Sequence, residues 1–229
     1  MAMLLAPAAL ANPPEGRTYT PGSFDRVEIS GSAVIRYIQG PRDEVFVEGD
    51  EDAQKAVALD VSQGVLRVLP SGSWKFWNSR RTQLTITSME LTRLSVSGAA
   101  DWLALEPVRA LRLSVSISGA GLARFDQLKA ESLSFGVSGA GDGQVAGVVE
   151  DLNISISGKS NFRGENLQSQ RARVSVSGIG DVKVWAMRDL AITVSGVGTV
   201  DYWGPASVSR RTSGIARIND RGAKPARAP

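Results

Sequence analysis

A Ser-Gly phrase preceded by alternating apolar residues returns throughout this chain, and its spacing constrains the fold more than any other feature. The clearest copies are RLSVSGAADWLA, SVSISGAGLARF, SFGVSGAGDGQV, NISISGKSNFRG, RVSVSGIGDVKV and AITVSGVGTVDY. The glycines of the phrase are Gly31, Gly98, Gly119, Gly139, Gly158, Gly178, Gly196 and Gly214. From Gly98 onward the steps between them are 21, 20, 19, 20, 18 and 18 residues. A repeat of about 20 residues is typical of a stacked solenoid.

Apolar and polar residues alternate around each glycine. The position two residues before it holds Val96, Ile117, Val137, Ile156, Val176 and Val194. The position four residues before it holds Leu94, Val115, Phe135, Ile154, Val174 and Ile192. This period of two predicts strands with one buried face, and the apolar positions after the glycine predict about three short strands in each repeat. A repeat of this length has no room for a crossover helix. We therefore expect one coil of a parallel β-helix per repeat, and a stack roughly 30–35 Å long.

The glycine of the phrase has two expected roles at the corner of a coil. It accepts a positive φ angle, and it allows close stacking on the same corner of the next coil. The serine before it is expected to form local hydrogen bonds and a stacked ladder. Open solenoid ends expose strand edges, so both ends are expected to be capped. At the C-terminal end the pattern weakens, because Arg210 and Thr212 stand where apolar residues recur in the other coils.

Composition excludes several classes of chemistry. The chain of 229 residues contains no cysteine and no histidine, so it can form no disulfide, zinc–thiolate site, cysteine nucleophile or Ser-His-Asp triad of its own. Its net charge of +3 comes from scattered basic residues, which disfavours nucleic-acid binding. No segment has 18 or more consecutive apolar residues, so we expect no transmembrane segment. No cofactor and no metal site are expected.

The repeat pattern divides the chain into four parts. Residues 1–11 are apolar and end in a small-x-small pattern, which predicts a signal peptide that lacks its basic start. Residues 12–22 are expected to be a linker and residues 23–220 a single β-helix domain, with regular coils from about residue 82. The first 90 residues have hairpin-like spacing, so this section is expected to be less regular and partly antiparallel, with one short helix or turn in EDAQKAVALDV. The Pro- and Arg-rich residues 221–229 are expected to be disordered.

Four stretches of the sequence resemble one bacterial family. They are FDRVEISGSAVIRYIQG, VFVEGDEDAQKAVALDVSQGVLRV, LTITSMELTRLSVSGAAD and the SGAGD and SGIGD reiterations, and together they cover residues 24–215. The order of these stretches is similar to that of the DUF2807 family, described as putative auto-transporter adhesin, head GIN domain. The resemblance implies a right-handed parallel β-helix in an exported bacterial protein, and it carries over no catalytic residue. The chain departs from the family pattern at 159–161 and 121–122, where Gly-Asp is lost.

Two repeated polar patterns are candidate sites. Asp101, Asp142 and Asp181 follow the repeat glycine by three residues, but in coils two apart, so roughly 10 Å would separate neighbours. That distance is too long for one shared cation, and we interpret them as turn carboxylates bonded to backbone N–H groups. The Ser-x-Ser pairs would form a flat hydroxyl face that fits a glycan, ice or another sheet, although a solvated face is the favoured interpretation. These pairs are Ser95/Ser97, Ser116/Ser118, Ser155/Ser157, Ser175/Ser177 and Thr193/Ser195.

The segment SGSWKFWNSRR, residues 71–81, interrupts the strand pattern. Its candidate ligand-binding residues are Trp74, Lys75, Phe76, Trp77, Arg80 and Arg81. Aromatic residues beside arginine are typical of a binding hot spot or of carbohydrate stacking. The same composition suits a loop folded over one end of the solenoid as a cap, and the sequence leaves both interpretations open.

The sequence predicts a non-catalytic binding or adhesion module that is exported to the periplasm or the cell surface. Its expected partner is a glycan or a protein of the envelope or surface. The first alternative is a structural component that self-associates into a homo-oligomer through its solenoid ends. The second is a polysaccharide-active enzyme, which is disfavoured because the acidic residues of the coils are dispersed and no long insertion forms a groove wall.

Overall fold

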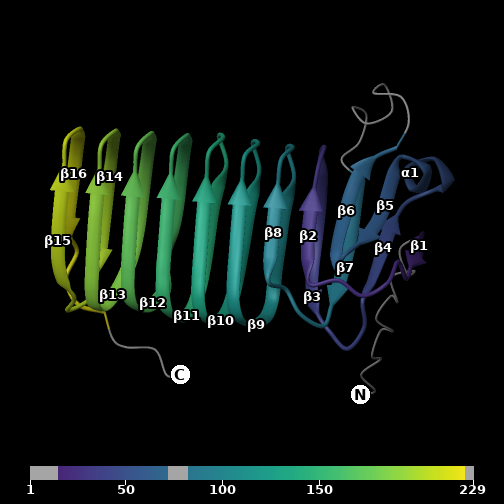
Figure 1. The fold of residues 1–229 in the computed structure, drawn as a ribbon, viewed down its shortest axis with the longest axis horizontal. Coiled ribbons are helices and arrows are strands. Elements are labelled where there is room, and N and C mark those ends of the chain that lie inside the picture. Colours follow the sequence, from purple (N-terminus) through teal and green to yellow (C-terminus); the bar gives the residue numbers. More distant parts are fainter. Residues whose placement is uncertain (1–14, 72–81, 225–229) are drawn as a thin grey trace, which may run out of the picture.

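The structure is a computed structural model that describes residues 15–71 and 82–224. The predicted signal peptide, most of the segment 71–81 with its six candidate ligand-binding residues, and residues 225–229 lie outside the described residues. Of the described residues, 72% are in strands and 2% in a helix. The strands form a β-solenoid of about six turns with a mixed sheet, and its coils lie side by side like rungs (Figure 1). The all-β solenoid predicted from the repeat is confirmed.

Each regular coil is one long strand. These strands are β9 (Asp101–Ile117), β10 (Leu122–Val137), β11 (Asp142–Ile156), β12 (Lys159–Val176) and β13 (Ile179–Val194). Each begins just after one Ser-Gly turn, ends just before the next, and pairs in parallel with its neighbours. The expectation of three short strands per coil is therefore wrong. The strand bends back halfway without losing its pairing, because register shifts such as the one between Phe125 and Leu128 absorb the bend.

The coil is thus flattened into two facing layers. We call the side with the Ser-Gly turns the turn edge, at the top of Figure 1, and the opposite side, where the strands bend, the bend edge. The leading layer holds the half of each coil that follows a turn, and the trailing layer the half that precedes the next turn. The chain then continues into β14 (Val197–Trp203) and β16 (Ile215–Asp220) in the leading layer and β15 (Ser207–Thr212) in the trailing layer.

The core lies between the two layers. All twelve apolar residues predicted at the two positions before the repeat glycines are buried. Rings fill the wider parts: Phe135 and Phe162 pack edge to face with centroids 5.0 Å apart, and Tyr37 stacks on Trp102 at 4.9 Å. The Tyr37 hydroxyl lies 2.9 Å from Ser88 Oγ, and burial raises the pKa of Tyr37 to about 12. Aliphatic and aromatic stacking between coils therefore continues through the whole solenoid.

The N-terminal section extends both layers with shorter strands. They are β1 (Gly16–Tyr19), β2 (Arg26–Ile29), β3 (Ala33–Gln39), β4 (Glu44–Glu48), β5 (Val57–Ser62), β6 (Val65–Pro70), β7 (Thr82–Ser88) and β8 (Arg93–Val96). The pairs β1–β4, β4–β7 and β5–β6 are antiparallel, as expected for this section. The helix α1 (Glu51–Lys55) lies between β4 and β5, and Asp50 caps it by accepting the Ala53 N–H. Strand β1 lies within the segment 12–22 that was expected to be a linker.

The repeat glycines are explained by stacking. Among these eight glycines only Gly31 has a positive φ, of 104°, so the expected conformational role does not apply to the regular coils. A methyl group added to any of the other seven would overlap the backbone of the glycine one coil earlier. The residue after each of these glycines donates its backbone N–H to the carbonyl of the repeat glycine one coil earlier, as Lys159 does to Gly139 O at 2.9 Å. The expected close approach is therefore confirmed, and it leaves no space for a side chain.

The turn serines bond mainly to backbone carbonyls of the preceding coil. Ser177 Oγ lies 3.3 Å from Ile156 O, and Ser97 Oγ lies 3.2 Å from Ile29 O. A direct contact between turn hydroxyls is recorded for Ser30 and Ser97, at 3.0 Å. Each such bond ties one coil to the coil before it. The serines therefore reinforce the turn edge from coil to coil.

Candidate functional site

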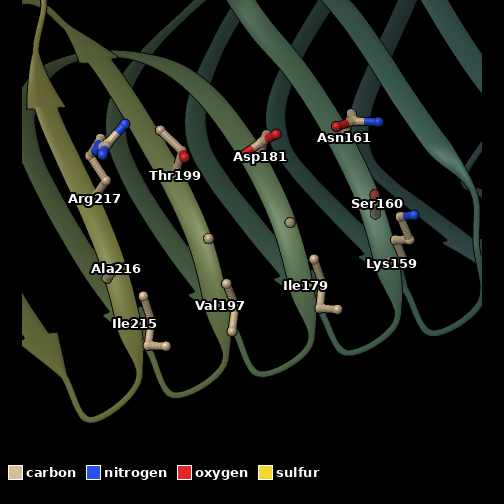
Figure 2. A pocket seen from close by; sticks show the side chains of 12 residues that line it. Lys159, Ser160, Asn161, Ile179, Asp181, Val197, Thr199, Ile215, Ala216 and Arg217 are labelled. Carbon is tan, nitrogen blue, oxygen red and sulfur yellow. The ribbon is translucent and has the colours of Figure 1, made fainter.

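The candidate site is a shallow groove of about 370 Å³ on the outer surface of the leading layer, beside the turn edge. It crosses β12, β13, β14 and β16. Figure 2 shows two parallel rows of side chains that border it. We call them the aliphatic row (Ile179, Val197 and Ile215) and the polar row (Asn161, Asp181, Thr199 and Arg217). On β12, Lys159 holds the position that corresponds to Ile179 of the aliphatic row.

The aliphatic row consists of the first residue after each Ser-Gly turn. Its members are register partners in successive coils, and their side chains are 56%, 46% and 76% exposed along the row. Side chains alternate across a strand, so the residue next to a buried position must point outward. Large aliphatic residues at an outward position have no role in the core. Three in adjacent rungs form a continuous apolar strip, which is typical of an interaction surface.

The polar row lies two residues further along each strand. Asn161 donates its backbone N–H and its Nδ2 to Asp142 Oδ1, at 2.8 and 3.0 Å. For the side chains of Asp181, Thr199 and Arg217, no hydrogen bond or ion pair occurs within residues 15–71 and 82–224. Three consecutive coils thus present a carboxylate, a hydroxyl and a guanidinium. The carboxylate accepts hydrogen bonds, the guanidinium donates them and the hydroxyl does both, so all three are able to bind a ligand.

The floor of the groove is backbone. Between the two rows lie Ser160, Gly180, Gly198 and Ala216, whose Cβ positions face the interior. Adjacent coils approach closely at this level, because a methyl group added to Gly198 would overlap Gly180 O of the preceding coil. Ser160 is 3% exposed, and its Oγ has no hydrogen-bond partner among residues 15–71 and 82–224. Small inward residues therefore hold adjacent coils at the close spacing that keeps the two rows parallel.

The groove continues toward the N-terminal end of the same face. A second hollow of about 330 Å³ lies between Asp101, Leu122 and Asp142 and reaches Gln144 and Arg163. In this part the aliphatic row is replaced by alanine, at Ala120 and Ala140. Along the solenoid axis, the residue that follows the turn thus changes from alanine to lysine and then to large aliphatic residues. A ligand that extends along the axis would contact both parts.

A wider hollow of about 770 Å³ lies at the bend edge and mixes apolar and charged residues. Met89 and Leu111, the most exposed apolar residues in it, are 55% and 56% exposed. Gln39 closes one side: its Nε2 donates to Met89 O and Arg109 O, and its Oε1 accepts the Arg109 N–H at 2.7 Å. Short rows of like residues occur here, such as Arg109 with Lys129 and Ala110 with Ala130, but the lining lacks the exposed aliphatic row of the turn-edge groove.

The polar patterns singled out in the sequence lie on opposite faces. Asp101, Asp142 and Asp181 stand in the leading layer with Leu122 and Asn161 between them, as the spacing predicted. Asp142 accepts a backbone N–H from the next coil, which confirms the interpretation of this residue as a bonded turn carboxylate. Asp181 accepts no such bond within the described residues, so the interpretation is wrong for that residue. Among the described residues, no group of three acidic side chains is arranged to hold a metal ion. The Ser-x-Ser pairs lie on the outer surface of the trailing layer.

The sequence reasoning missed the aliphatic row. The sequence does contain the pattern. From Gly98 onward, the residue after the repeat glycine changes from alanine to lysine and then to Ile179, Val197 and Ile215, at a position where the alternation of the strand points the side chain outward. An apolar residue at the wrong phase indicates a surface rather than a core. The six candidate residues of the Trp-rich segment lie outside the described residues and stay a prediction.

Comparisons with known proteins agree on the family and the fold. The family model described as putative auto-transporter adhesin, head GIN domain (DUF2807) matches residues 23–206. A putative adhesin from Bacteroides fragilis is similar in structure, with a TM-score of 0.83 at 21% identity, over 93% of this chain and 98% of that chain. A putative adhesin from Parabacteroides distasonis is similar at a TM-score of 0.74 and 17% identity, over 92% and 96% of the two chains.

A third solved structure carries a different name. It is a putative lipid binding protein from Parabacteroides distasonis, similar at a TM-score of 0.68 and 16% identity over 93% of this chain and 98% of that chain. No curated protein matches the sequence. In the part of the chain that the structure describes, no helix has the length and apolar character needed to cross a membrane.

Proposed function

This chain belongs to the DUF2807 family, putative auto-transporter adhesin, head GIN domain, and from that premise we propose that it is a non-catalytic, adhesin-type binding module. The proposal includes export and action at the cell envelope. The apolar segment 1–11 and the family's description support this location. The names of the structural neighbours as adhesins support a binding role without a chemical step.

The observation that carries the proposal is the aliphatic row beside the polar row. The aliphatic row is bordered by the polar row, in which the side chains of Asp181, Thr199 and Arg217 form no hydrogen bond within the described residues. This arrangement resembles the apolar centre and polar rim of protein–protein interfaces. The described groove holds no aromatic residue, whereas carbohydrate sites favour aromatic stacking. We therefore assign the groove to a protein partner on a cell surface, and a glycan is the competing outcome of the test.

The test compares the two faces of the solenoid. In one variant, Ile179→Arg with Val197→Arg places two charges on the aliphatic row at exposed positions, so the fold is expected to persist. Its matched control is Ser116→Arg with Ser155→Arg on the opposite layer. Purified proteins are incubated with bacterial envelope fragments, and the retained fraction is measured. We expect retention of the groove variant to fall about tenfold or more and that of the control to stay unchanged.

The same assay distinguishes the kind of partner. Retention that protease treatment of the fragments abolishes supports a protein partner, whereas retention that only periodate abolishes assigns the groove to a glycan instead. Unchanged retention of the groove variant, or an equal loss in the serine-face control, would contradict the assignment of binding to this groove. Circular dichroism of each variant verifies that the strands remain.

A further inference from the structure

The last described residues fold back along the bend edge. After β16, the Arg221 N–H donates to Tyr202 O at 2.9 Å, and the Gly204 N–H donates to Gly222 O at 3.0 Å. Gly222 has a φ of 81°, which turns the chain toward β13 and β12 beneath the coils (Figure 1). This path brings Lys224 to the outside of three successive coils, far from the turn-edge groove.

The ammonium group of Lys224 sits against two indole rings. Its Nζ lies 4.7 Å from the ring centroid of Trp203 and 5.6 Å from that of Trp185. The two tryptophans are register partners in β13 and β14, so their spacing is set by the pairing of the coils. The same Nζ donates to Glu165 O at 2.7 Å. Two aromatic faces and a carbonyl oxygen together are the elements of an ammonium-binding site.

Polar atoms of the same residues remain without partners. Trp185 is 3% exposed, and within the described residues its Nε1 forms no hydrogen bond. Glu165 Oε2 is likewise buried and has no hydrogen-bond partner in that part of the chain. The other oxygen, Glu165 Oε1, lies 3.9 Å from Lys183 Nζ. Glu165 Oε2 can accept a hydrogen bond from an ammonium group, and Lys224 does not make this contact. The Trp185 N–H is a donor and gains no bond from an ammonium group.

We propose that Trp185, Trp203 and the backbone carbonyl of Glu165 form a binding site for a primary alkylammonium group, the chemistry of a lysine side chain, and that Lys224 occupies this site in the free protein. A primary amine is favoured over a quaternary one because the Glu165 carbonyl needs an N–H donor. The site is separate from the turn-edge groove and does not depend on the function proposed for that groove.

Lys224 is suited to act as a displaceable occupant. Among the described residues, the last main-chain hydrogen bond of the tail is the one to Gly222 O, two residues before the lysine. A short tether keeps the local concentration of the competing ammonium high, so an external amine binds weakly until Lys224 is removed or displaced. A partner that holds the tail elsewhere would open the site.

The test measures amine binding with and without Lys224. The indole N–H signals of Trp185 and Trp203 are followed by NMR during titration with pentylamine and, separately, with Nα-acetyl-lysine methylamide. In Lys224→Ala we expect both signals to shift and the affinity to be at least about tenfold higher than in the unmodified protein. Tetramethylammonium, which has the same charge but no N–H donor, is expected to bind more weakly.

Two further variants make the result decisive. Trp203→Phe in the Lys224→Ala background retains a ring of weaker cation affinity, and we expect it to reduce amine binding. Lys55→Ala removes a lysine of α1 in the N-terminal section, away from both sites, and is expected to leave the titration as in the unmodified protein. Binding of either amine supports the site, and their affinity ratio distinguishes a free amine from a protein lysine. Lower stability of Lys224→Ala with no response to either amine would show that Lys224 is only a structural latch.

Discussion

At the scale of the residue, the repeat glycines show how one amino acid is required for a reason that its backbone angles do not reveal. Gly98 to Gly214 lie in conformations open to other residues, yet a methyl group on any of them would overlap the preceding coil. The Ser-Gly phrase could be recognised in the sequence and its corner position predicted. Which of the two expected roles applies could not be predicted, because the approach of the next coil is a long-range contact.

A pair of glycines in the same strand region tests this explanation. In Gly139→Ala the new methyl group overlaps Gly119 O, so adjacent coils must separate, and we expect the free energy of unfolding to fall by about 2–4 kcal/mol. The matched control is Gly136→Ala, where the nearest atom to the added methyl group is Val115 O at 3.9 Å. There we expect a gain of roughly 0.5–1 kcal/mol, because alanine loses less conformational entropy than glycine on folding. Urea unfolding of both variants measures the difference. Equal effects would contradict the stacking explanation.

Inward-facing residues were the easiest to predict from the sequence. Leu94, Val115 and Val174 follow a strict alternation, and alternation alone places them in the core. The aliphatic row was missed because a search for core positions passes over the outward phase. The cluster around Lys224 was missed for another reason: Trp185 and Lys224 meet only because the tail folds back, and no local pattern encodes that contact.

At the scale of the element, each coil is one bent strand rather than three straight ones. The sequence favoured three because apolar residues recur nine residues after the glycine, and Leu128 and Leu167 are indeed buried there. At the bend the strand keeps its hydrogen bonds to the neighbouring coils, and the bend is visible in the pairing only as a shift in register. Such shifts depend on how two coils of different length align, so the composition of one coil does not reveal them.

The last strand of the trailing layer carries a charge at a core position. Arg210 is the register partner of Ile192, which is buried, and it donates to the Tyr202 hydroxyl at 2.7 Å. Strand β15 pairs on one side only within the described residues, and inward charges are one way in which open edges avoid pairing with other chains. This feature opposes the alternative in which the protein self-associates through this end.

Replacing that charge should change the association state. In Arg210→Val the open end gains an apolar inward residue, and we expect dimers or larger species that increase with protein concentration in sedimentation velocity. The control is Arg211→Val, which removes a neighbouring charge from the outward phase beside Thr193. It is expected to stay in the state of the unmodified protein. Association in both variants, or in neither, would show that the inward position of Arg210 is not what protects this end.

At the scale of the whole molecule, the solenoid is a stack in which each coil depends on its neighbours. The extensive contacts join consecutive elements, such as β12 with β13 and β10 with β11. In such one-dimensional structures stability is approximately a sum of coil and interface terms. The overall fold was therefore predictable from a single repeat and its period, whereas the antiparallel N-terminal section required contacts that only the structure provides.

Removing one full coil tests this additivity. Deletion of residues 159–178 joins Gly158 to Ile179 and stacks β13 directly on β11. We expect a folded protein of lower stability, with an m-value lower by roughly one sixth because one of about six turns is lost. Deletion of residues 159–168 alone removes half a coil, breaks the register, and is expected to prevent folding. If circular dichroism shows that the half-coil deletion folds as well as the full one, the stack is not organised by whole coils.

The shifts at the bend edge have a consequence for how such a chain tolerates insertions. Between β12 and β13 the offset between paired residues is 20 at the leading end, where Lys159 meets Ile179, and 18 at the trailing end, where Val176 meets Val194. Differences in coil length are thus taken up at the bend, and every turn returns to the same phase. A residue gained or lost there leaves the spacing of the aliphatic and polar rows intact. The turn edge therefore keeps a constant spacing from coil to coil, so coil length is free to change while the aliphatic and polar rows stay in register.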